Sequence, residues 1–151
     1  MLNFFDQEQQ LTNQQIGQIE KELSFKFPQE FRSHLLNYNG GRCDPNVFKF
    51  QENGKPAYSS IDWFLSVYDG EYDNFKKYYT IYKIDEKRLP SNIVPIAHDP
   101  GGNLICLEID TGRVFFWNHE REVDYSISSD TDYSNLYLVA NNFNEFLEGL
   151  A

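Results

Sequence analysis

The chain begins with apolar residues that recur at the spacing of an α-helix. In residues 11–23, Thr12 is suited to the N-cap position and Gln15 stands where it closes a capping box. The apolar residues that follow fall on one side of such a helix: Ile16, Ile19 and Leu23. This pattern predicts a first amphipathic helix.

A second helix is predicted to begin at Pro28, because proline suits the first helical position. Glu30 favours the positive end of the helix dipole. The residues expected to face inward are Phe31, Leu35 and Tyr38. Gly40 and Gly41 are predicted to end the helix.

After these glycines the apolar spacing changes to that of β-strands. Residues 46–51 alternate apolar and polar types, and residues 59–67 form an aromatic and β-branched run. Asn53, Gly54 and Pro56 are turn residues between them, so the two segments are predicted to form a hairpin. Residues 73–84 fit a helix, although their tyrosines and a threonine keep a strand as the alternative. The inward positions of that helix are Phe75, Tyr79 and Tyr82.

Three strand-like segments come next, at residues 91–98, 103–109 and 113–119. The turn sequences Asp-Pro-Gly-Gly and Asp-Thr-Gly separate them, which predicts an antiparallel meander. The middle segment is apolar at positions of both alternating faces, so a strand covered on both sides is expected, with helices packed on one face.

The last segment, residues 136–150, combines an extended apolar stretch with a short helix. Asn142 and Glu145 have the spacing of a capping box. The apolar side of this helix consists of Phe143, Phe146, Leu147 and Leu150. No repeat, linker or low-complexity tract interrupts the chain. We therefore predict a single α+β domain over residues 1–151, with a central, mostly antiparallel sheet and helices packed about it.

Composition adds a strong charge to this picture. The 151 residues are 40% hydrophobic and 17% aromatic, which is enough for one core, and their formal net charge is −10. Such a charge opposes direct binding to nucleic-acid phosphates or anionic membranes, and a basic partner is its natural complement.

Carboxylates and tyrosines gather on two predicted loops, at residues 68–75 and 128–135. Solvation and a partner-binding surface are both open as explanations. The residues that we predict to contact a partner are Asp69, Glu71, Tyr72 and Asp73 in the first loop, with Asp130, Asp132 and Tyr133 in the second.

Location and redox state are predicted from what the sequence lacks. The first residues have neither a basic start nor a long apolar run, and no segment approaches about 20 apolar residues, so we expect a cytoplasmic protein. Cys43 and Cys106 lie far apart in sequence, which favours reduced thiols over a disulfide, and two cysteines alone do not make a four-ligand zinc site.

Residues 97–120 contain the best candidates for chemistry. The glycine pair there does not suit phosphate binding, because no lysine follows it and the next segment is a strand. His98 and Asp99 are adjacent, so in a strand their side chains point to opposite faces, and a catalytic pair needs a distant partner. The serines and cysteines lack a nucleophile motif.

Metal and stacking sites are not predicted either. His34, His98 and His119, with Glu120 and Glu122, show no HxH, HxxxH or HExxH spacing. Trp63 and Trp117 lie in strand patterns, where a place in the core or on a sheet face is expected. The sequence thus predicts no catalytic residue, no metal and no cofactor.

The order of several motifs resembles a known family. Residues 11–41, a strand with Trp63, residues 93–120 and residues 139–150 together resemble the SUKH superfamily, in its branch related to the fungal cell-wall assembly regulators. The motif residues are Pro28, Phe31, Gly40, Gly41, Trp63, Asp99, Gly101, Gly102, Asn103, Trp117, Phe143 and Phe146. Pro100 departs from the usual small or acidic residue of the glycine turn.

The resemblance implies an α+β fold with a largely antiparallel sheet and no catalytic residues. It also implies an immunity protein of the bacterial type, which binds and neutralises the toxin domain, often a nuclease, of a polymorphic secreted toxin. An acidic protein suits this role because it can occupy a basic nuclease cleft. Fungal relatives act instead as regulatory scaffolds, which is the alternative, and an enzyme is the third hypothesis. Self-association stays open.

Overall fold

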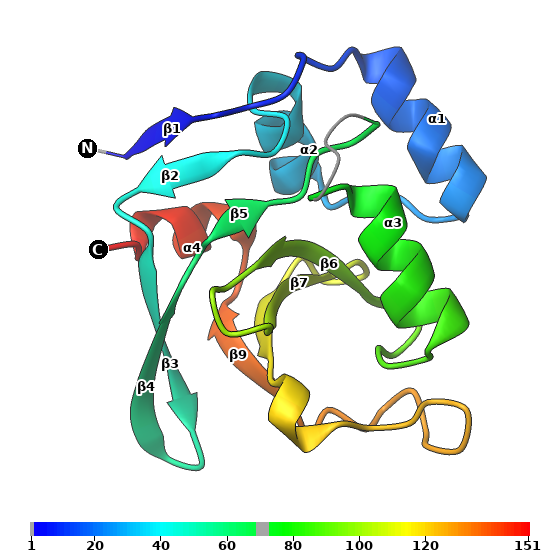
Figure 1. The fold of residues 1–151 in the computed structure, drawn as a ribbon, viewed down its shortest axis with the longest axis vertical. Coiled ribbons are helices and arrows are strands. Elements are labelled where there is room, and N and C mark those ends of the chain that lie inside the picture. Colours follow the sequence, from blue (N-terminus) through cyan, green and yellow to red (C-terminus); the bar gives the residue numbers. More distant parts are fainter. Residues whose placement is uncertain (1, 69–72) are drawn as a thin grey trace.

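A five-stranded antiparallel sheet forms the centre of the computed structural model, which describes residues 2–68 and 73–151. Its strands follow the order β5-β6-β7-β8-β9: β5 (Trp63–Phe64), β6 (Ile93–His98), β7 (Leu104–Glu108), β8 (Val114–Trp117) and β9 (Leu136–Ala140). Every neighbouring pair is antiparallel. The predicted meander and the α+β class are confirmed (Figure 1).

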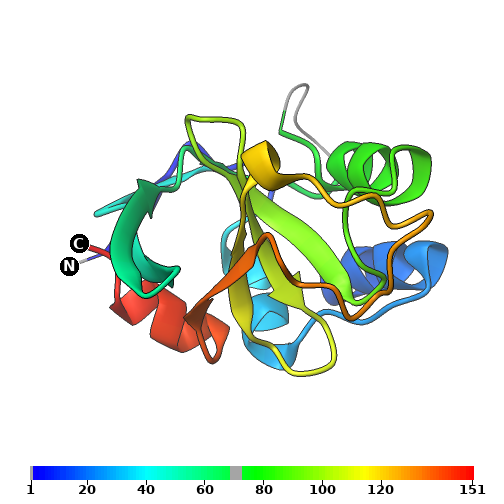
Figure 2. The ribbon, with the colours of Figure 1, turned by 90° about the horizontal axis from the view of Figure 1, so that it is seen from below.

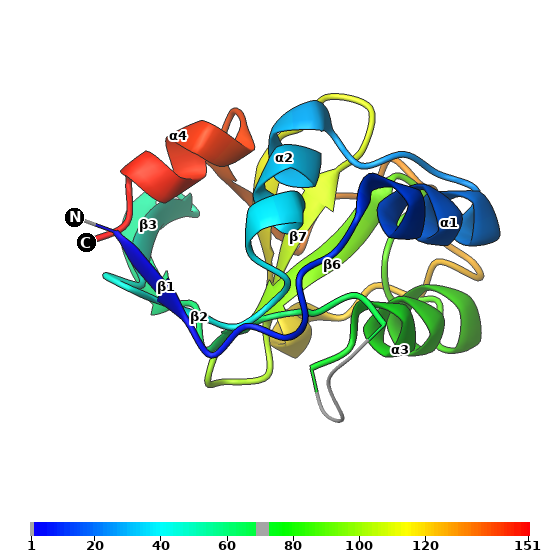
Figure 3. The same ribbon diagram turned by 90° about the horizontal axis from the view of Figure 1, so that it is seen from above.

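Both faces of this sheet are covered, as the apolar middle strand predicted. All five residues of β7 are buried. One face packs against α1 (Asn13–Leu23), α2 (Gln29–Asn37), α4 (Phe143–Glu148) and the β3–β4 hairpin. The other face is covered by Leu89 and, partly buried, Tyr78, Tyr82 and Tyr133. Figure 3 shows α2 lying across β6 and β7.

The hairpin of β3 (Val47–Glu52) and β4 (Lys55–Ser60) corrects one prediction. The partner of the first strand is β4, not the aromatic run 59–67. Asn53 and Gly54 both have positive φ, 54° and 79°, so the chain reverses within two residues and pairing resumes at Lys55. Pro56 therefore lies within a strand, and Trp63 and Phe64 join the central sheet instead. In Figure 2 this hairpin and α4 lie at one end of the molecule, and α1 and α3 at the other.

A second small sheet, β1 (Asn3–Phe5) with β2 (Arg42–Asp44), was not predicted. It explains the second glycine of the pair, Gly41, whereas Gly40 lies against Ser66. The second helix already ends at Asn37, and Tyr38 is extended, so the glycines are not its cap. Gly40 and Gly41 have φ of 74° and 90°, and a Cβ on Gly41 would stand 2.5 Å from the carbonyl oxygen of Phe5. They allow two backbones to approach closely.

The helix starts follow their predicted caps. The Thr12 hydroxyl accepts from the backbone N–H of Gln15, and the Gln15 side chain accepts from that of Thr12, which completes the capping box. In the second helix Pro28 precedes the first helical residue, one position earlier than predicted. Asn142 accepts from the backbone N–H of Glu145, whereas the Glu145 carboxylate accepts from Asn141.

The segment with two alternatives is helical. It forms α3 (Phe75–Tyr79), which continues as the π-helical turn η1 (Thr80–Asp85). Phe75 and Tyr79 are buried as predicted, and Tyr82 is half-buried. A last short helix, η2 (His119–Arg121), follows β8. It begins the long connection 118–135 that leads to β9.

Candidate functional site

The first predicted acidic cluster precedes α3. Asp69, Glu71 and Tyr72 lie outside the described residues, so only Asp73 can be placed. Its backbone carbonyl accepts a hydrogen bond from the backbone N–H of Ser66 at 2.8 Å. Its carboxylate pairs with Nε2 of His98. Asp73 therefore ties the start of α3 to the end of β6.

His98 contacts a carboxylate that is distant in sequence, as a catalytic pair would need, but it lacks the geometry of a catalytic base. Nε2 contacts Asp73, whereas Nδ1 lies 3.3 Å from the carbonyl oxygen of Asp99 and 3.7 Å from the Asp62 carboxylate. A general base needs a ring nitrogen directed at the proton that it removes. Because both nitrogens are engaged within the protein, the pair is structural.

The other candidates for chemistry are held in the framework. Burial among aromatic rings lowers the pKa of His34 to about 4. His119 lies with Nδ1 2.6 Å from the side-chain oxygen of Asn103. Cys43 and Cys106 are free, buried thiols whose pKa is raised by burial. Within residues 2–68 and 73–151, no three His, Cys, Asp or Glu side chains are placed to hold a metal together.

The second predicted cluster lies on the connection 118–135, which we call the acidic loop. Asp130 is exposed, with one carboxylate oxygen 3.3 Å from the backbone N–H of Ser91. Asp124 and Asp132 accept from the backbone N–H groups two residues ahead, at 2.9 and 3.0 Å. Hydrogen bonding by the side chains of Ser126 and Ser134, together with these backbone bonds, holds the pKa of both carboxyls below the usual value. The loop is thus shaped by its own turns and remains charged.

Tyr133 points inward from this loop. Its hydroxyl lies 2.5 Å from Oε2 of the buried Glu108, which also accepts from Nε of Arg113 at 2.8 Å and from Thr111. Burial alone would raise the pKa of Glu108, but these bonds and the charge of Arg113 hold it below its usual value. Tyr133 therefore fastens the loop to β7, and its hydroxyl is already in use.

Lowering the pH below about 4.5 is expected to narrow the stability difference between the wild type and Glu108→Gln. Because the folded pKa of Glu108 is depressed, its contribution is present above the usual pKa of 4.5 and is lost as the pH falls through the folded pKa. The glutamine does not titrate. Urea unfolding of both proteins from about pH 7 to about pH 3 measures this. A difference that stays constant over this range would contradict it.

A groove of about 290 Å³ separates the acidic loop from η1. Its lining residues are Tyr79, Lys83, Ile84, Lys87, Leu89, Ser91, Tyr125 and Asp130. The Lys83 amine donates to the carbonyls of Pro90, Ser91 and Ile93 at 2.8 to 2.9 Å. Burial lowers the pKa of this amine to about 8, so at neutral pH it is an ammonium that ties η1 to β6.

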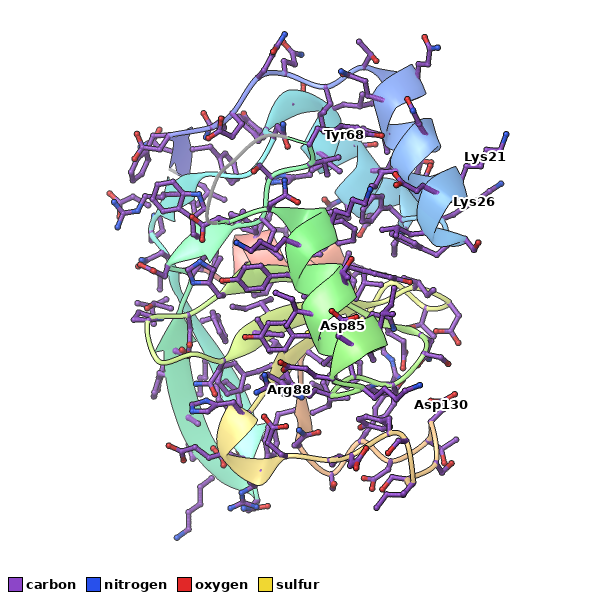
Figure 4. All side chains as sticks on the ribbon, turned by 45° about the vertical axis from the view of Figure 1, so that its right-hand side comes forward. Lys21, Lys26, Tyr68, Asp85, Arg88 and Asp130 are labelled. Carbon is purple, nitrogen blue, oxygen red and sulfur yellow. The ribbon has the colours of Figure 1, made fainter. Side chains whose placement is uncertain are left out.

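Two apolar side chains stand exposed beside the acidic carboxylates. Ile84, in η1, is 54% exposed, and Ile127, in the acidic loop, is 85% exposed. Figure 4 shows Asp85 at the end of the helix and Asp130 on the neighbouring loop. Sequence reasoning missed both isoleucines, since a single apolar residue in a polar segment gives no periodic signal.

The two acidic clusters do not lie side by side in the structure. Asp73 lies directly before α3, whereas Asp130 lines the groove beside the end of η1, so the helix separates them. The same helix and the long connection are seen at the right of Figure 1. A partner that touches both clusters must therefore also cover the helix between them.

Among the described residues, none of the helices has the length and apolar character needed to cross a membrane.

These observations define the class of protein: an α+β domain with an antiparallel meander covered on both faces. The model of the SMI1 / KNR4 family (SUKH-1) matches residues 10–149, and the chain belongs to this family. The predicted family is confirmed. The chain is also 29% identical over 150 residues to the SPbeta prophage-derived uncharacterized protein YokK of Bacillus subtilis (strain 168), a match that covers 92% of this chain and 74% of that protein.

Proposed function

We propose that this protein, as one domain over residues 1–151, is a cytoplasmic immunity protein. It would bind the toxic C-terminal domain of a cognate secreted polymorphic toxin and block its action. SUKH proteins are commonly immunity proteins that bind partner proteins, which supports an immunity role and a protein partner. We further propose that the partner is a nuclease with a basic cleft, because the net charge of −10 complements such a surface.

The proposed mechanism rests on the exposed carboxylates of the acidic loop. Asp124, Asp130 and Asp132 are charged groups on a segment held by two local hydrogen bonds and by one from Ser91, so little ordering is needed when a partner binds. Carboxylates in this position would steer a basic domain toward the protein and compete with its phosphate-bearing substrate. Asp69, Glu71, Tyr72 and Asp73, with Tyr133, complete the proposed contact set. No chemical step is required of this chain.

Co-expression tests the function. A neighbouring reading frame for a long secreted protein with a variable C-terminal domain would supply the toxin. We expect that domain to stop growth alone, and growth and a stable complex to return when this chain is co-expressed. A regulatory scaffold, the other role in the family, would leave the toxic domain active. Growth arrest that this chain does not relieve would therefore contradict the immunity proposal.

Neutralising two loop carboxylates is expected to slow association with the toxin domain. Asp130→Asn with Asp132→Asn keeps the shapes and the acceptor oxygens but removes two charges, so we expect an association rate about tenfold lower at low salt and a weaker salt dependence. The matched control is Asp44→Asn with Glu148→Gln. These two exposed carboxylates belong to β2 and α4, which lie at the left of Figure 1, opposite the acidic loop. Equal effects of both pairs in stopped-flow mixing would argue against the loop.

A further inference from the structure

A row of aromatic side chains from α3, η1 and the neighbouring strands lies between the two acidic clusters. His98 stacks on Tyr78 with ring centroids 5.8 Å apart, Tyr78 stacks on Tyr82 at 5.6 Å, and Tyr82 meets the edge of Trp117 at 5.6 Å. Trp63 pairs with His98 across β5 and β6. We call these five residues the aromatic strip.

An arginine stacks on the tryptophan at each end of the strip. The guanidinium of Arg42 lies 5.1 Å from the ring centroid of Trp63. Arg88 lies 4.6 Å from that of Tyr82 and 4.9 Å from that of Trp117. Figure 4 shows Arg88 between the end of the helix and η2. Tyrosine, tryptophan and arginine are the residue types that contribute most to binding energy in protein interfaces.

The strip is accessible from solvent. Trp63, Tyr78, Tyr82 and His98 are half-buried, whereas Trp117 is fully buried beneath them. Within the described part of the chain, the hydroxyls of Tyr78 and Tyr82 make no hydrogen bond, although Tyr79 and Tyr133 each make one or more. Two rigid rings with unused hydroxyls offer both apolar area and polar contacts to a partner.

Carboxylates flank the strip at both ends. Asp62 and Asp73 contact the two nitrogens of His98, beside Tyr78. Glu86 and Glu122 contact the guanidinium of Arg88, with about half of each side chain exposed. Four carboxylates against two arginines leave an excess of negative charge around the strip, which disfavours a phosphate-bearing ligand and favours a basic one.

We propose that the aromatic strip is the central contact surface for a basic protein. Lysine or arginine side chains of that protein contact the solvent-accessible carboxylates of Asp62 and Asp73 beside His98, while Tyr78 and Tyr82 pack against apolar parts of the partner. This inference rests on the proposed function and locates its binding energy: the acidic clusters steer the partner, and the strip between them holds it. A partner that contacts both acidic clusters also covers the helix between them, and the strip lies along that helix.

Alanine substitutions at the two tyrosines test the proposal. With the toxin domain of the co-expression experiment as the probe, Tyr78→Ala and Tyr82→Ala are each expected to raise the dissociation constant at least about 30-fold. The matched control is Tyr58→Ala, at a 65% exposed tyrosine on β4 that also lies near a lysine, Lys49. It should change the constant less than about fivefold.

A third variant leaves every ring in place, in case the alanine variants do not fold. Asp62→Asn removes one of the carboxylates that flank the strip and is expected to weaken binding about tenfold. If the wild type relieves toxicity but all folded variants bind within about twofold of it, the strip is overturned and the immunity function stands. If the wild type neither binds the toxin domain nor relieves its toxicity, the proposed function is wrong, and so is the proposal that the strip binds this partner. A free protein that is dimeric, and becomes monomeric on Tyr78→Ala, would make the strip a self-interface and overturn the proposal.

Discussion

Replacing Gly41 with alanine is expected to remove a large part of the stability of the fold. The new Cβ would stand 2.5 Å from the carbonyl oxygen of Phe5 and 3.0 Å from the backbone of Asp6, where no flexible side chain can yield. The residue would also keep a φ of 90°, which costs an alanine about 1–2 kcal/mol. With about 1–3 kcal/mol for overpacking, we expect a loss of about 2–5 kcal/mol.

Gly54→Ala is the matched control for this prediction. Gly54 has a φ of 79°, yet nothing lies within 4 Å of a Cβ built there, so only the conformational cost of about 1–2 kcal/mol applies. The free energy of unfolding from urea titration measures both variants. Equal losses would mean that the close approach between β1 and the chain at Gly41 contributes nothing, which would contradict the explanation given for this family glycine.

The parts of the fold that were predicted correctly have strong local signals. The capping box of Thr12 and Gln15 needs only residues three apart, and the turns at Asp99 and Asp110 lie between strands that are adjacent in sequence. Where pairing skips along the chain, the prediction failed. β1 and β2 are three residues each and pair across about 40 positions, so neither has a pattern of its own.

The candidate site was less predictable for the same physical reason. Asp130 is exposed, as its polar neighbours in sequence indicate, and its contact with a partner stays a prediction. Tyr133 has similar neighbours, but its hydroxyl contacts Glu108, 25 residues away, and no local pattern indicates that bond. The aromatic strip is assembled from β5, α3, η1, β6 and β8, so its members share no spacing. Only the fold brings them together.

Asp99→Ala is expected to destabilise the protein by about 3–5 kcal/mol. The Asp99 carboxylate is 6% exposed and accepts four hydrogen bonds. The donors are the backbone N–H groups of Gly101 and Asn103, the side-chain amide of Asn103 and the hydroxyl of Ser59, all at 2.8 to 2.9 Å. Alanine leaves these donors without their acceptor, and each unpaired buried group costs about 1–3 kcal/mol, although the costs do not add fully.

Stability measurements on matched variants test whether the Asp99 carboxylate is structural. Asp110→Ala is the control, because Asp110 occupies the next turn and accepts one exposed bond, from Asn92 at 3.2 Å, so we expect a loss below about 1 kcal/mol. Asp99→Asn keeps one acceptor oxygen and should fall between the two. For a domain of this size the Asp99→Ala loss corresponds to a fall in Tm of about 6–20 °C. A Tm close to that of the wild type would show that the carboxylate is dispensable for the turn and would contradict its structural role, in which three of its bonds hold the β6–β7 connection and the fourth joins that connection to β4.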